Sequence, residues 1–96
     1  MKFDRALWVD EDKFYDAPYP RAQMLGDVRS QVLKKGMSRQ DVIAALGEPS
    51  DSGKFADRGL AYWVSPEKGT ISIDSQWLVV ALDAQGKVTD TDIATD

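Results

Sequence analysis

The segment from Gly36 to Pro49 constrains the fold of this chain more than any other stretch, because it marks where one helix ends and the next begins. Gly36 follows a helical run and suits the left-handed position that terminates a helix. Ser38 and Asp41 form a capping box, with Asp in place of the usual Glu or Gln. Gly47 and Pro49 then stop the second helix. The segment therefore predicts two helices joined by a short connection, with both glycines at positive φ.

Hydrophobic periodicity places an apolar face on each of these helices. The first is predicted over residues 21–35, where apolar side chains recur with the spacing of one helical face: Met24, Leu25, Val28 and Val32. The second is shorter, about two to three turns, and its apolar face is formed by Val42, Ile43 and Leu46. Each helix is expected to pack this face against the rest of the domain.

The remainder of the chain has the pattern of β-strands. Strands are predicted over residues 60–64, over residues 77–82 with residues 71–73 at the beginning of the same strand, and over residues 88–93. Residues 83–86 form the hairpin turn between the last two, and Gly86 is suited to positive φ. The expected fold class is α+β, in which two helices pack on a three-stranded antiparallel sheet in the order ααβββ.

The central strand is apolar on both faces, which two short helices cannot cover. Leu78, Val80 and Leu82 share one face, and Trp77, Val79 and Ala81 share the other. Residues 1–20 contain five of the nine aromatic residues, which makes a free tail improbable: Phe3, Trp8, Phe14, Tyr15 and Tyr19.

Residues 1–20 are therefore predicted to form an extended N-terminal arm that shields the second face. Pro18 and Pro20 exclude a helix through Tyr19. The arm is expected to fold against the sheet face opposite the helices, with Phe3 and Trp8 near Trp77 and Val79. If the arm stays away, that face is instead a binding patch for a partner.

Composition excludes several classes of function. The chain has no Cys and no His, so thiol catalysis, Cys/His zinc sites and a His-activated serine are excluded. No phosphate-binding glycine loop is present, and the net charge of −4 with scattered bases argues against nucleic acid. Asp90 and Asp92 share a strand face and offer a cation site, but acidic edge strands more often resist aggregation. We expect no enzyme, no cofactor and no metal.

The segment Lys35–Pro49 resembles the Gly-Met-Ser/Thr-x-x-x-Val-x-x-x-Leu-Gly-x-Pro signature of the BamE/SmpA/OmlA-like domain family. The resemblance divides the chain into the arm 1–20 and a family-like domain 21–96. It implies an outer-membrane lipoprotein that assists β-barrel assembly by contacting partner subunits. The chain departs from the family in its long aromatic arm and in having no lipid-acceptor Cys and no signal peptide, so we expect an orphan relative.

The function expected from this resemblance is non-enzymatic protein binding in the cell envelope. The location would be the periplasmic face of the outer membrane, with membrane contact only through a lipid anchor absent from this sequence, or the cytoplasm if Met1 is the native start. A rival interpretation is an inhibitor of an enzyme or toxin, either of the immunity type or similar to the β-lactamase-inhibitor proteins, whose fold this one resembles. Because Trp and Tyr dominate binding hot spots, the candidate partner-binding residues are Trp8, Tyr15, Tyr19, Trp63 and Trp77.

Overall fold

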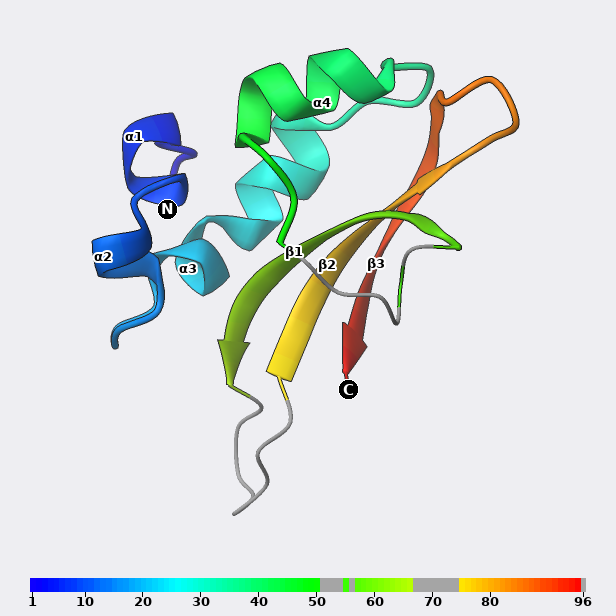
Figure 1. The fold of residues 1–96 in the computed structure, drawn as a ribbon. Helices are drawn as coiled ribbons and strands as arrows, with labels where there is room; N and C mark the ends of the chain where they lie inside the picture. The colour runs from blue at the N-terminus through cyan, green and yellow to red at the C-terminus, as the bar shows by residue number, and fades with distance from the viewer. Residues whose placement is uncertain (51–54, 56, 67–74, 96) are drawn as a thin grey trace.

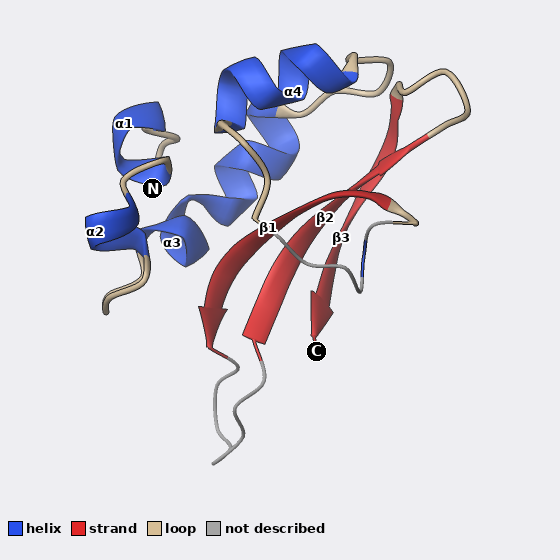
Figure 2. Ribbon diagram, viewed as in Figure 1, coloured by secondary structure: helices blue, strands red, loops and turns tan. Residues whose placement is uncertain are grey.

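The computed structural model describes residues 1–50, 55, 57–66 and 75–95. Their elements in chain order are α1 (Arg5–Trp8), α2 (Glu11–Phe14), α3 (Pro20–Asp27), the π-helical turn η1 (Val28–Val32), α4 (Arg39–Leu46), β1 (Gly59–Pro66), β2 (Ser75–Leu82) and β3 (Val88–Thr95). The strands form one antiparallel sheet in the order β1-β2-β3. The labelled helices gather on one side of this sheet (Figure 1). Figure 2 shows the same arrangement with the helices in blue and the strands in red. The α+β class is confirmed, although the described residues form four short α-helices and not two.

The strand register places the two faces of the sheet as the sequence indicates. In β2, Leu78 and Val80 belong to the main core, whereas Trp77 and Val79 belong to a second cluster on the other face. The hairpin turn between β2 and β3 ends at Gly86, whose φ is 75°. The expected beginning of the middle strand at residues 71–73 lies outside the described residues.

Helix α4 begins and ends as the capping pattern predicts. The hydroxyl of Ser38 accepts a hydrogen bond from the backbone N–H of Asp41 at 3.1 Å, and the Asp41 carboxylate accepts one from the N–H of Ser38 at 3.4 Å. Gly47 ends the helix with φ 79°. A Cβ atom on Gly47 would also lie 2.9 Å from Cγ1 of Val9, so the N-terminal segment packs tightly against this helix end.

The first predicted helix ends earlier than expected. Helix α3 continues into η1 and stops at Val32, after which Leu33 adopts an extended conformation. Gly36 has the predicted positive φ of 88°, but it does not terminate the helix. Its N–H instead donates to the carbonyl of Val88 at 2.8 Å. Pairing with the start of β3, together with burial of the Leu33 side chain in the core, therefore replaces the last predicted helical turn.

The N-terminal arm is neither extended nor placed on the predicted face. Residues 5–8 and 11–14 form α1 and α2, each with an Asp side chain that accepts a backbone hydrogen bond at its N-cap. Trp8 is fully buried in the main core, on the helix side of the sheet, and its ring centroid lies 6.2 Å from that of Tyr62. Phe3 packs against the same core. The prediction that Phe3 and Trp8 cover Trp77 and Val79 is therefore wrong.

The opposite face is covered in a different way. Phe55, from the connection between α4 and β1, packs there with its ring centroid 5.9 Å from that of Trp77. Ala61 and Val79 are buried in the same cluster, and Trp63 packs against it. The side chains of β1 and β3 on this face include Ala61 and Ala94, which are small and require little cover.

Candidate functional site

Four aromatic side chains meet where the end of α2 reaches the edge strand β1, and we call them the aromatic patch: Phe14, Tyr15, Tyr19 and Trp63. The Tyr15 ring lies 4.7 Å from that of Trp63 between centroids, and Tyr19 contacts the same indole edge-on at 6.2 Å. Phe14 is buried beneath Tyr15 at 4.3 Å. Tyr15 is 51 % exposed, which makes it one of two exposed large hydrophobic residues in the described part of the chain.

The backbone conformation between α2 and α3 brings these rings together. Asp10 caps α2, and the helix is only four residues long, so Phe14 and Tyr15 come at its end. Tyr19 has a left-handed backbone with φ 55°, and Pro20 directly begins α3. The chain therefore reverses between α2 and α3 and brings both tyrosines back to Trp63. The prediction that no helix passes through Tyr19 is confirmed.

The remaining two predicted partner-binding residues lie in different environments. Trp77 is directly opposite Trp63 in the strand register and belongs to the cluster on the same sheet face. It is therefore continuous with the aromatic patch. Trp8 has no exposed surface and serves the main core. The structure thus brings Tyr15, Tyr19, Trp63 and Trp77 into one region and sets Trp8 apart from them.

Arg21 ties the patch to the core and was not anticipated from the sequence. Its side chain is only 3 % exposed, although it carries a charge. Its Nε donates to the carbonyl of Trp8 at 2.7 Å and its Nη1 to the carbonyl of Trp63 at 2.9 Å. The guanidinium carbon also lies 3.6 Å from the ring centroid of Phe14, a cation–π contact. No sequence pattern signals such a residue, because its partners are backbone atoms far along the chain.

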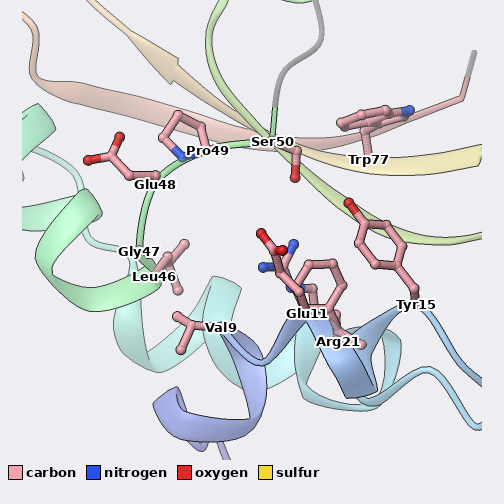
Figure 3. A pocket seen from close by; sticks show the side chains of 11 residues that line it. Val9, Glu11, Tyr15, Arg21, Leu46, Gly47, Glu48, Pro49, Ser50 and Trp77 are labelled. Carbon is pink, nitrogen blue, oxygen red and sulfur yellow. The ribbon is translucent and has the colours of Figure 1, made fainter.

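A pocket of about 410 Å³ opens beside the aromatic patch. It lies between α2, the end of α4 and the sheet, and Figure 3 shows the labelled side chains that surround it. Arg21, Glu11 and Glu48 supply its charged groups, and its remaining lining comes from apolar, aromatic and small residues: Val9, Phe14, Tyr15, Leu46, Gly47, Pro49, Ser50 and Trp77.

Burial shifts the pKa values of two groups in this region. Desolvation lowers the pKa of Arg21 to about 10, partly offset by the nearby Tyr15, Tyr62 and Glu11. Desolvation also raises the pKa of Tyr62 well above its usual range. The Tyr62 hydroxyl donates to the carbonyl of Gly47 at 2.9 Å, at the end of α4. Both groups keep their usual protonation state at neutral pH, so this region presents a permanent buried cation.

The acidic side chains of strand β3 form hydrogen bonds and a salt bridge within the protein. Asp92 forms a salt bridge with Arg58 at 3.1 Å, and this hydrogen bond lowers the pKa of Asp92. The carboxylates of Asp90 and Asp92 also accept hydrogen bonds from the backbone N–H groups of Thr91 and Ile93. Among the described residues, no cluster of three or more acidic side chains is positioned to hold a metal ion.

A comparison with known protein families identifies the family of this chain. Residues 26–92 match the outer membrane protein assembly factor BamE domain. The chain belongs to the BamE family. No curated protein and no solved structure matches it.

The BamE match begins within α3 and ends within β3, so it contains all the described residues of β1 and β2 and the first part of β3. Of the residues near the pocket, Trp63 and Trp77 lie inside the BamE domain, whereas Tyr15, Tyr19 and Arg21 precede the matched region. The aromatic patch therefore joins the family domain to the N-terminal segment of this chain. In the part of this chain that the structure describes, no helix has both the length and the apolar character to span a bilayer.

Proposed function

We propose that this chain is a non-enzymatic cell-envelope module that binds another protein of outer-membrane assembly through the aromatic patch. Its family is that of an outer-membrane protein assembly factor, which supports a role beside other proteins of the envelope. The absence of Cys and His throughout the sequence supports a role without catalysis. Nothing in the fold or in the family match favours the inhibitor alternative.

The observation that carries this proposal is the exposure of Tyr15 on top of an ordered aromatic stack. Tyr15 is 51 % exposed, while Phe14 below it is buried and Trp63 beside it is partly buried. Aromatic side chains held rigidly at a surface lose little conformational entropy on binding, and they are enriched at interface hot spots. Arg21 fixes this stack because it binds the Trp63 carbonyl and lies against Phe14.

Site-specific photocrosslinking tests the proposal directly. A photoreactive phenylalanine at position 15 should crosslink one envelope protein in cells that produce the full chain. The matched control carries the same group at Thr89, an exposed position on strand β3 at the far edge of the sheet. A product at position 15 that disappears on Trp63→Ala, with none at position 89, supports the patch. Equal crosslinking at both positions would contradict it.

A further inference from the structure

The charge of Arg21 lacks an anionic partner within the described residues. Neither of their two salt bridges includes Arg21, and both acceptors of its hydrogen bonds are neutral backbone carbonyls. A guanidinium has five N–H donors, of which these bonds use two. Arginine is almost never buried to this extent unless it is paired with an anion. The remaining donors therefore mark a place where an acceptor would be strongly favoured.

Those donors face the pocket beside the aromatic patch. Arg21 lines the pocket, and Figure 3 shows its guanidinium nitrogens directed toward the middle of the space. A volume of about 410 Å³ lies at the lower end of the range for ligand pockets, large enough for a few side chains.

The rim of the pocket carries the opposite charge. Glu11 and Glu48 both line it, and both are exposed residues. The Glu11 carboxylate lies close enough to raise the pKa of Arg21 but forms no salt bridge with it. A lone anion that enters would be repelled by these carboxylates, whereas a ligand that also carries cationic groups would pair with them.

We propose that this pocket receives a carboxylate side chain of the partner protein, on a segment that also carries lysine or arginine two residues away on either side. The carboxylate pairs with the free N–H groups of Arg21, and the flanking cations pair with Glu11 and Glu48. Charge complementarity thus selects a segment of alternating sign. The inference rests on the proposed function, because it identifies the chemistry that the partner of the aromatic patch presents.

Two capped peptides test the inference on the full chain. The probe is acetyl-Lys-Leu-Glu-Leu-Lys-amide, and the matched control replaces its central Glu with Gln. Binding is followed by NMR through the Nε–H resonance of Arg21 and the indole resonance of Trp77. We expect saturable shifts of both resonances with the Glu peptide, and binding at least tenfold weaker with the Gln peptide, because an ion pair to a buried guanidinium is lost.

A rim variant and an inorganic anion complete the test. Glu48→Gln alters an exposed side chain, so the protein should stay folded while its affinity for the Glu peptide falls severalfold. Equal binding of the Glu and Gln peptides would overturn the inference, and if position 15 still crosslinks, the proposed function stands without it. Inorganic phosphate that shifts the Arg21 resonance as strongly as the Glu peptide would also overturn it, since the pocket would then be a general anion site.

Discussion

Gly59 occupies a position at the start of β1 that a side chain cannot fill. Its φ is 145°, and a Cβ atom there would lie 2.1 Å from the carbonyl oxygen of Val80 on the neighbouring strand. Backbone atoms of a central strand cannot move aside without breaking ladder hydrogen bonds. Gly36 has a positive φ as well, but open space surrounds the position of its missing Cβ. Gly59 is therefore required both by its backbone conformation and by the lack of space for a side chain, whereas Gly36 is required by its backbone conformation alone.

Gly59→Ala is expected to lower the free energy of unfolding by about 3 kcal/mol or more, because the clash adds to the backbone strain. Gly36→Ala should cost about 1–2 kcal/mol, the strain of a left-handed backbone alone. Urea unfolding of both variants measures the difference. Equal losses would show that the contact between Gly59 and Val80 is relieved by a small shift of β1.

Tyr62 couples the stability of the domain to alkaline pH. Burial raises its pKa above the usual value near 10, so the folded state holds the phenolic proton more tightly than the unfolded state does. The stability that this proton contributes is complete below pH 10 and falls as the pH rises further. Arg21, whose pKa is lowered to about 10, acts in the opposite direction, because the folded state releases its proton before the unfolded state does.

Tyr62→Phe should cost about 1 kcal/mol at neutral pH, through loss of the hydrogen bond to Gly47. Above about pH 10 the difference between wild type and variant should shrink, since only the wild type loses stability by ionisation at this position. Arg21 is present in both proteins, so the largest part of its contribution, which comes from burial, is common to them. Urea unfolding between about pH 7 and pH 11 checks this, and a constant difference would contradict the burial argument.

At the scale of elements, the edge of β1 is closed by the segment that follows α4. The Ser50 N–H donates to the carbonyl of Ala61 at 2.9 Å, and the Ser50 hydroxyl accepts from the N–H of Trp63 at 3.0 Å. Arg21 then binds the Trp63 carbonyl. An open strand edge invites pairing with other chains. These contacts therefore occupy backbone groups of β1 that would otherwise be open to pairing with another chain.

Ser50→Ala is expected to lower the free energy of unfolding by about 1–3 kcal/mol, because the partly buried N–H of Trp63 loses its acceptor. Amide exchange at Trp63 should accelerate, as measured by NMR. Ser30→Ala serves as the control, since the Ser30 hydroxyl donates to a helix carbonyl at an exposed site and its loss should cost less. Unchanged exchange at Trp63 would mean that another group closes the edge.

At the scale of the whole molecule, the N-terminal segment packs into the same core as the region that matches the BamE domain. Trp8 is fully buried among residues of the sheet and helices, and Phe14 supports both Arg21 and Tyr15. The backbone N–H of Phe3 is held by the carboxylate of Asp27 at 2.7 Å. The expected boundary between an arm and a separate domain at residue 20 therefore does not correspond to a break in packing.

Trp8→Ala should destabilise the full chain by about 3–5 kcal/mol, because a large cavity would open in the main core. Such a loss is a large fraction of the stability of a domain this size. Tyr15→Ala is the matched control in the same segment and should cost about 1 kcal/mol, since it removes a half-exposed ring and its two aromatic contacts. Thermal unfolding followed by near-ultraviolet circular dichroism distinguishes them. Similar midpoints for both variants would show that the segment is dispensable.

The sequence by itself determined the elements whose signals are local. The cap at Ser38, the stop at Gly47 and the turn at Gly86 depend on side chains within a few residues of each other, so they could be predicted without tertiary information. The same holds for the alternation of β2, because each strand residue faces opposite its neighbour. The family signature is made of these local features, which explains why the family could be identified from the sequence.

Only the tertiary structure decided the features that depend on distant partners. The first long helix ends at Val32, after which Leu33 is buried in the core and Gly36 and Met37 pair with Val88 at the start of β3. The aromatic residues of the arm gave no indication of which sheet face each would meet, since hydrophobic burial has no direction. Arg21 acquires its role from two backbone carbonyls distant in sequence. Helix ends and strand faces can be predicted from the sequence pattern. The pocket cannot, because its lining residues come from α2, the end of α4 and the sheet, which are distant in sequence.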